Sequence, residues 1–147
     1  MNFLAPHSLV LYTLFILNLP LIAQREITGA WLTEKDEALI QITETDGIFS
    51  GTIVWLRQPL DKSGQPKKDR HNSSPELRAR YLLGIPVIYK MRYNPGKKQW
   101  DGGKVYIPRF GKEIDAIISL ENKNILKLKG FTGGGKVSHT QVWQRKA

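Results

Sequence analysis

The sequence contains no cysteine, and only three of its 147 residues are histidine. The absence of cysteine excludes disulfide bridges, thiolate zinc sites, cysteine nucleophiles and a thioether-linked lipid anchor. Acidic residues are also scarce, because 13 Asp and Glu stand against 22 Lys and Arg and leave a formal charge of +9. Hydrophobic residues make up 41% of the chain, which is typical of a globular protein. The length favours a single domain.

The first 23 residues contain no Lys, Arg, Asp or Glu, and residues 9–22 are almost wholly apolar. This run is too short for a membrane span, which needs about 20 residues, but it suits the apolar core of a secretory signal. We therefore expect residues 1–23 to be a signal peptide that is cleaved near Ala23. Residues 24–147 would then form one exported domain, in the periplasm or outside the cell. A retained short anchor is the alternative.

Short runs of alternating apolar and polar residues, separated by turn signals, occupy most of the remaining chain. The expected strands span residues 28–32, 38–43, 49–56, 86–93, 104–107, 113–120, 125–130 and 139–145. Asp46-Gly47 is typical of a tight hairpin turn between two of them. The pattern predicts an all-β protein, an up-and-down antiparallel β-barrel of about eight strands.

Residues 58–80 interrupt this pattern with prolines, many charges and no strand period. Ser74 followed by Pro75 is typical of a helix start, so we expect a short helix of one or two turns that ends at Tyr81 or Leu82. A connection of this length in a small domain is usually functional. Its basic side chains are a candidate surface for anionic lipid, glycan or a partner protein: Lys67, Lys68, Arg70, Arg78 and Arg80.

Signals for catalysis are weak. Neither His71 nor His139 has a second His, Asp or Glu at metal-ligand spacing, and no nucleophile elbow occurs. We therefore predict no catalytic residue, no metal site and no cofactor. An enzyme stays an alternative, and it would depend on the convergence of four loop residues: Asp61, Asp69, Asp101 and His71.

Residues 130–137 match the spacing of a phosphate-binding loop, but Val137 stands where Ser or Thr would hold magnesium. That loop also needs a helix after it, whereas the following residues predict a strand. We therefore interpret Gly133–Gly135 as a hairpin turn. The basic balance also raises nucleic acid as a partner. Aromatic residues do not interleave with the basic cluster, and export separates the protein from nucleic acid, so we predict no such partner.

Two tryptophans mark the first and last predicted strands, in Gly29-Ala30-Trp31 and in Trp143-Gln144-Arg145. These strands are neighbours in a closed barrel, so Trp31 can pack under Arg145 by cation–π contact and stem packing. Gly29, Trp31, Trp143 and Arg145 thus form a structural signature. The arrangement resembles the GxW strand and the C-terminal basic residue of lipocalins.

Further segments extend this resemblance to nearly the whole mature chain. They are Gly51-Thr52-Ile53-Val54-Trp55-Leu56, Leu77-Arg78-Ala79-Arg80-Tyr81-Leu82-Leu83-Gly84-Ile85-Pro86 and Trp100-Asp101-Gly102-Gly103-Lys104-Val105-Tyr106-Ile107-Pro108. Over about residues 26–145 the chain is similar to the exported bacterial family known as domain of unknown function 2147. The resemblance implies a lipocalin-like barrel and export, and it implies no catalytic set. Relatives often carry Asp where this chain has Ile107, and they carry cysteines, so no role of that carboxylate or of a disulfide is transferred.

Strand alternation places aromatic residues and a methionine on the expected inner face, with basic residues near the mouth. The predicted ligand-binding residues are Trp55, Tyr89, Met91, Tyr93, Trp100, Arg92, Lys104 and Arg109. An apolar lining with few polar groups is typical of small-molecule sites. The favoured function is therefore non-enzymatic binding of a small apolar or amphipathic, and possibly acidic, ligand. The alternative is a solid interior filled by the same side chains; a volume above about 300 Å³ would favour a ligand.

Overall fold

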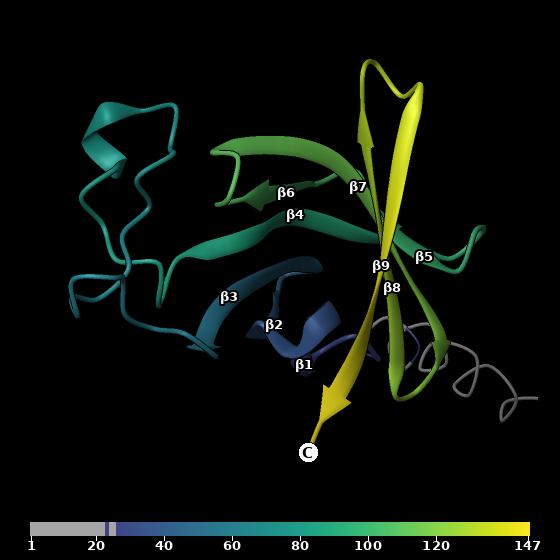
Figure 1. Cartoon of the computed structure of the whole chain (residues 1–147). Coiled ribbons are helices and arrows are strands. Elements are labelled where there is room, and N and C mark those ends of the chain that lie inside the picture. Colours follow the sequence, from purple (N-terminus) through teal and green to yellow (C-terminus); the bar gives the residue numbers. More distant parts are fainter. Residues whose placement is uncertain (1–22, 24–25) are drawn as a thin grey trace, which may run out of the picture.

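The computed structural model describes Ala23 and residues 26–147, which form a barrel with one long loop at its side (Figure 1). Its strands are β1 (Gly29–Leu32), β2 (Ala38–Thr45), β3 (Ile48–Leu56), β4 (Pro86–Asn94), β5 (Gln99–Asp101), β6 (Lys104–Ile107), β7 (Lys112–Asn122), β8 (Ile125–Thr132) and β9 (Val137–Lys146). Two short 3-10 turns are η1 (Glu34–Asp36) and η2 (Pro75–Leu77). The predicted signal peptide lies outside the described residues except for Ala23, so its cleavage stays a prediction.

All strand pairings are antiparallel and, apart from those of β5 and β6 and the closing pair, join strands that are consecutive in the chain; the sheet closes where β1 meets both β2 and β9. Strands β5 and β6 share one position, because each pairs with β4 on one side and with β7 on the other. Nine strands therefore occupy eight positions of a closed ring. This confirms the predicted up-and-down barrel. Among the described residues, no helix has the length and apolar character that a membrane span requires.

One half of the barrel interior is filled by large side chains. Trp100 packs edge-on against Phe49, with 6.1 Å between ring centroids, and its centroid lies 4.9 Å from that of Tyr93. The fully buried members of this filled half include Ile42, Phe49, Ile88, Met91, Ile118 and Leu126. Their close packing closes this end of the barrel to solvent.

The first and last strands are held together by Arg145. Its guanidinium lies 4.2 Å from the ring centroid of Trp31, and it donates hydrogen bonds to the carbonyl oxygens of Thr28 (2.7 Å) and Lys123 (2.6 Å). Gly29 has a φ of +120°, and a Cβ there would lie 2.9 Å from the Arg145 guanidinium. Glycine is thus required both for the backbone conformation and for the approach of the cation.

A β-bulge overturns the expected orientation of Trp55. Ile40 pairs with Ile53, but the residue before it, Leu39, pairs with Trp55. Val54 is therefore an extra residue in β3. An extra residue shifts the alternation by one position. Trp55 therefore points outward and is 45% exposed, and the prediction that it faces the interior was wrong.

Strand β4 departs from simple alternation for the same reason. Its register against β3 shifts twice, since Phe49 pairs with Met91 while Gly51 pairs with Ile88. Lys90 adopts a positive φ of 54° at this irregularity. Both Val87 and Ile88 are consequently buried, although they are adjacent in the chain.

The predicted helix in the long loop is reduced to the single turn η2. The Ser74 hydroxyl donates to the Glu76 carboxylate at 2.5 Å and caps no backbone group. Backbone pairing between Lys68 and Tyr81 ends the helical stretch, since Tyr81 belongs to an extended segment. The glycines at 133–135 form the hairpin turn between β8 and β9, as expected.

We expect Arg145→Ala to lower the free energy of unfolding by about 2 kcal/mol, because charged hydrogen bonds to carbonyl oxygens and a cation–π contact are both lost. Urea denaturation followed by tryptophan fluorescence measures this. The neighbouring exposed residue supplies the control, Lys146→Ala. Equal stability losses in the two variants would show that Arg145 does not hold the barrel closed.

Candidate functional site

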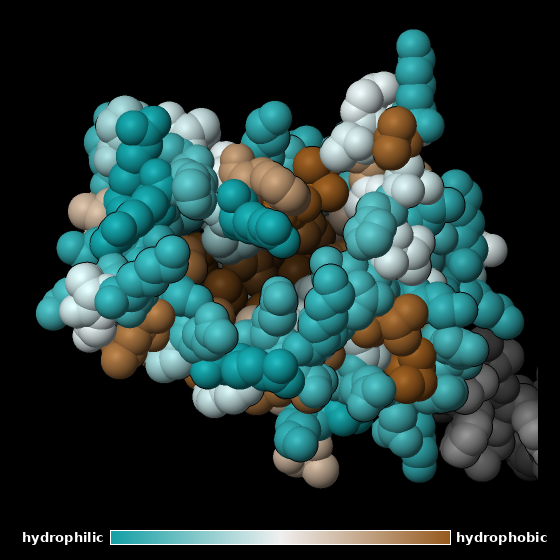
Figure 2. Space-filling view, viewed as in Figure 1, coloured by the Kyte–Doolittle hydropathy of each residue, from teal (hydrophilic) through white to brown (hydrophobic). Residues whose placement is uncertain are grey.

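The other half of the barrel interior is open, and it holds a cavity of about 1170 Å³. Figure 2 shows this hollow, with hydrophobic residues at its bottom and hydrophilic ones around its rim. Residues from the β1–β2, β3–β4 and β6–β7 connections line it, together with Thr132 and Val137 at the ends of β8 and β9 that border their hairpin turn. The cavity therefore opens at the end of the barrel where these connections lie. The alternative of a solid interior does not hold for this half.

The wall of the cavity is formed by inward-facing strand residues, and on the same strands the inward-facing residue two positions away belongs to the filled half. On β2, Ile40 lines the cavity while Ile42 belongs to the filled half; on β7, Ala116 and Ile118 divide in the same way. On β8, Leu128 lines the cavity and Leu126 does not. Each of these strands therefore has inward residues in both halves. The remaining apolar wall residues on the strands include Ile53, Val87, Val105 and Ile114.

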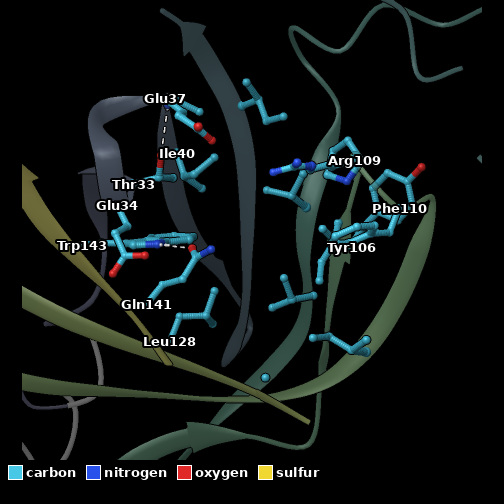
Figure 3. A pocket seen from close by; sticks show the side chains of 18 of the residues that line it. Thr33, Glu34, Glu37, Ile40, Tyr106, Arg109, Phe110, Leu128, Gln141 and Trp143 are labelled. Carbon is cyan, nitrogen blue, oxygen red and sulfur yellow. Dashed lines mark hydrogen bonds between the residues drawn. The ribbon is translucent and has the colours of Figure 1, made fainter. Parts of the chain in front are cut away.

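Trp143 is the largest side chain of the cavity wall, and it is only 4% exposed. Its indole N–H donates to the Oε1 of Gln141 at 2.9 Å (Figure 3). The indole therefore presents its ring to the cavity while its one polar group is already satisfied. A ligand beside Trp143 meets apolar surface.

Basic side chains predominate around the mouth. Five of the lining residues are cations, against two carboxylates: Lys35, Arg57, Lys67, Arg109 and Lys112 against Glu34 and Glu37. Arg57 forms an exposed ion pair with Asp36 at 3.3 Å. Within residues 26–147, no ion pair joins Lys67, Arg109 or Lys112 to a carboxylate. In Figure 3 the Arg109 side chain extends into the pocket toward the opposite wall.

A buried polar cluster anchors the long loop to the barrel beside this mouth. The Asp69 carboxylate, only 1% exposed, accepts hydrogen bonds from the Tyr106 hydroxyl (2.5 Å), the Asn72 amide (2.8 Å) and Arg80 (2.9 Å). The Arg80 guanidinium also lies 5.7 Å from the ring centroid of Tyr106. Arg80 was predicted as a surface cation, but its ion pair with Asp69 holds it in this anchor. A buried charge is retained only when it is paired in this way.

The loop also contacts the β6–β7 turn through its backbone. Gly111 has a φ of +64°, and a Cβ there would overlap the carbonyl oxygen of His71. The turn that carries Arg109 is therefore packed directly against the loop.

Burial, together with the hydrogen bond to Asp69 and the charge of Asp69, raises the pKa of Tyr106 to about 12. Burial would lower the pKa of Arg80, but the hydrogen bond and the charge of Asp69 outweigh it and raise that pKa. Both shifts show that the anchor stabilises a protonated tyrosine and a charged arginine side by side.

Among the predicted ligand-binding residues, Arg109 lines the cavity. Met91 and Trp100 are buried in the filled half, and Tyr93 packs on Trp100. The Tyr89 hydroxyl donates to the Pro86 carbonyl oxygen at 2.7 Å, and Lys104 pairs with Asp115 on the outer surface at 2.9 Å. Arg92 is exposed. Apart from Arg109, the predicted ligand-binding residues therefore lie away from the cavity wall, as Trp55 does. Strand alternation predicts which side chains face inward, but not which half of the interior is filled.

Sequence reasoning missed Trp143 and Tyr106 as cavity residues. Trp143 had a signal, since it follows Gln141 by two positions on a predicted strand, but it was assigned only a structural role. Tyr106 was quoted within a family motif and given no role of its own. Ile114, Ala116 and Leu128 also line the cavity. They stand at alternating apolar positions of the strands expected at residues 113–120 and 125–130, and that alternation is the signal that could have found them.

The basic loop residues fall into different environments. Lys67 lines the cavity, Lys68 lies 5.9 Å from the Tyr81 ring centroid, and Arg70 pairs with Asp61 at 2.7 Å. Arg78 donates through its Nε to the Asn72 carbonyl oxygen at 2.8 Å. The predicted cluster is therefore divided between the mouth, the anchor and the outer surface.

The carboxylates that might have converged in an active site belong to separate networks. Asp61 accepts from Ser63 and Gln65 within its own turn, Asp69 lies in the loop anchor, and Asp101 accepts from Gln99 at 2.8 Å on β5. Within the described part of the chain, no three His, Asp or Glu side chains gather as metal ligands would.

The closed up-and-down barrel, the Trp31–Arg145 contact and the single-ended cavity together define a lipocalin-like barrel. The chain belongs to the family described as uncharacterised proteins conserved in bacteria, DUF2147, whose profile matches residues 29–145.

Protein HP1028 from Helicobacter pylori, described as belonging to the lipocalin family, has a similar structure with a TM-score of 0.67 and 23% identity. The match covers 82% of this chain and 83% of HP1028, and it supports the fold. A redesigned β-barrel matches with a TM-score of 0.44 and 16% identity, over 85% of this chain and 96% of that one. A search of curated proteins gives no significant match.

Stability should fall between pH 10 and pH 12 more steeply in the native protein than in Tyr106→Phe. A tyrosine in the unfolded chain ionises near pH 10, whereas Tyr106 keeps its proton in the folded state until about pH 12. The folded state therefore binds more protons in this window, and the free energy of unfolding decreases as the pH rises. Chemical denaturation at several pH values measures the slope.

Tyr81→Phe is the matched control, because it removes the same hydroxyl from an exposed tyrosine outside the anchor. The same slope in the native protein and in Tyr106→Phe would contradict the role assigned to the anchor.

Proposed function

We propose that the protein is a non-enzymatic binding protein that takes one amphipathic molecule into the barrel, with its apolar part inward and an acid group at the mouth. The observation that carries this proposal is the open cavity of about 1170 Å³, apolar inside and bordered by cations. Small-molecule sites of proteins occupy about 300–1,000 Å³ and combine an apolar lining with few polar groups. The cavity is therefore large enough for a lipid-sized ligand.

The polar groups near the wall favour an apolar deep end. The indole N–H of Trp143 donates a hydrogen bond to Gln141, and the hydroxyl of Tyr106 donates one to Asp69. Among the described residues, no buried side-chain polar atom lacks a partner. A polar group placed deep in the cavity would lose water and gain little in return, whereas an alkyl chain gains about 25 cal/mol for each Å² removed from water.

The mouth favours an acid. Lys67 and Arg109 approach it from two different connections and have no carboxylate partner in residues 26–147. A carboxylate or phosphate between them would receive charge-assisted hydrogen bonds, and arginine can do so with two parallel bonds. We place this binding outside the cytoplasm, a proposal that depends on the apolar run of residues 9–22.

Dodecanoic acid and dodecan-1-ol separate the two parts of this proposal, because they share an alkyl chain and differ in charge. We expect the double variant Lys67→Gln, Arg109→Gln to bind the acid at least about tenfold more weakly. The loss of one charged hydrogen bond is enough to lower the affinity by that factor. Affinity for the alcohol should change less than twofold. Isothermal titration calorimetry measures both, and Lys97→Gln, Lys98→Gln on the turn at the other end of the barrel is the charge control.

A second pair of variants tests occupancy of the barrel itself. Ala116→Phe places a large side chain in the cavity and should abolish binding of both compounds, whereas Ile117→Phe on the same strand points outward and should not. Equal binding by these two variants, or no binding of either compound by the native protein, would overturn the proposal.

A further inference from the structure

We propose that the outer face of the long loop is a docking surface for an anionic lipid bilayer. This inference goes beyond ligand binding, and it stands on the geometry of residues 59–83 alone. It does not require the cavity to be occupied.

The loop contains a small antiparallel sheet made of three extended segments. Leu60 pairs with Pro66, and Lys68 pairs with Tyr81. Backbone hydrogen bonds complete it, from Lys67 to Pro59 (2.9 Å) and from Leu82 to the carbonyl oxygen of Lys67 (2.9 Å). The segments are therefore residues 59–60, 66–69 and 80–82, which we call the loop sheet.

The two faces of the loop sheet differ. Directly paired residues lie on the same face, and successive residues alternate. The inner face carries Lys67 and Leu82, which line the cavity, and Asp69 and Arg80, which form the anchor. The pairs Leu60–Pro66 and Lys68–Tyr81 consequently share the outer face, and Leu83 follows Tyr81 by two positions.

The outer face exposes large apolar side chains. Leu60 is 51% exposed, Tyr81 55% and Leu83 52%. Single exposed apolar residues are ordinary on protein surfaces. Here Leu60 and Tyr81 share the outer face of one small sheet and exposed Leu83 lies in the turn directly after it, and such a grouping points to an interaction. The Lys68 ammonium lies 5.9 Å from the Tyr81 ring centroid, so a cation belongs to the patch itself.

The charge around this patch selects its partner. Residues 58–80 contain six Lys and Arg against three Asp and Glu, and the whole chain carries +9. A second copy of the same positive face would be repelled. A soluble acidic polymer would meet the cations but leave the apolar groups in water. An anionic bilayer satisfies both, because lysine heads reach phosphates while tyrosine and leucine enter the interface.

The anchor makes this face a fixed part of the molecule. Asp69 accepts hydrogen bonds from Tyr106 of β6 and from Arg80 within the loop. Backbone hydrogen bonds hold the loop sheet together. Docking through the outer face would then bring lipid next to the mouth, to which the inner face contributes Lys67 and Leu82.

The absence of cysteine permits a test at single sites. Leu83→Cys, labelled with a polarity-sensitive dye, should gain intensity and shift to shorter wavelength with phosphatidylglycerol vesicles, and not with phosphatidylcholine vesicles. The same dye at Val142→Cys, an exposed apolar position on β9, should not respond. Because each dye reports its own site, contact made by residues 1–25 does not produce the expected difference.

A charge variant completes the test. In the background Lys62→Gln, Lys68→Gln the response at position 83 should require severalfold more phosphatidylglycerol, since each cation near an anionic surface changes the partition coefficient about fivefold. Lys97→Gln, Lys98→Gln at the opposite end is the matched control. Added salt should weaken the native response in the same direction.

Three outcomes would overturn the inference. They are no response of the dye at position 83 to phosphatidylglycerol, an equal response to a soluble acidic polysaccharide, and a response to protein concentration without vesicles, as in self-association. Titration with dodecanoic acid in the absence of vesicles keeps the two proposals distinguishable. Intact acid binding with a failed vesicle response would remove only the docking surface.

Discussion

The contact between Arg145 and Trp31 is the interaction on which the rest of the structure depends. A sheet of eight positions encloses a volume only if its first and last strands pair, and Arg145 holds β9 against β1 through a cation–π contact and hydrogen bonds to carbonyl oxygens. The residue before Ala30 must be glycine, since a Cβ would meet the cation. Closure places this contact at the filled end and leaves the opposite end open.

The two halves of the interior are packed differently. Trp100, Phe49 and Met91 pack together and fill one half, whereas Trp143 and Tyr106 stand in the wall of the other half, where Ala116 and aliphatic residues leave the cavity between them. The connections at the open end then supply the polar groups. Arg109 comes from one turn and Lys67 from the loop that Asp69 anchors, so the basic mouth depends on contacts between segments distant in sequence.

The barrel was predictable from alternation and turn signals, because both are local. The orientation of Trp55 was not, since one extra residue, Val54, reverses the phase of β3 at a bulge that only the pairing with β2 reveals. The site was predictable only in part. Arg109 was chosen as a residue of the mouth, but the anchor joins Asp69 to Tyr106 across 37 positions, and no local pattern encodes that contact. The predicted short helix is present as the single turn η2, but it ends at Leu77 rather than at Tyr81 or Leu82, because Tyr81 pairs with Lys68.

Methyl NMR tests the central claim most directly, because β2 and β8 each carry a methyl-bearing residue in the cavity wall and another in the filled half. Titration with dodecanoic acid should shift the methyl signals of Ile40 and Leu128, which line the cavity, and leave those of Ile42 and Leu126 in the filled half nearly unchanged. Equal shifts in both halves, or shifts confined to outward-facing residues such as Val142, would contradict a ligand site inside the barrel.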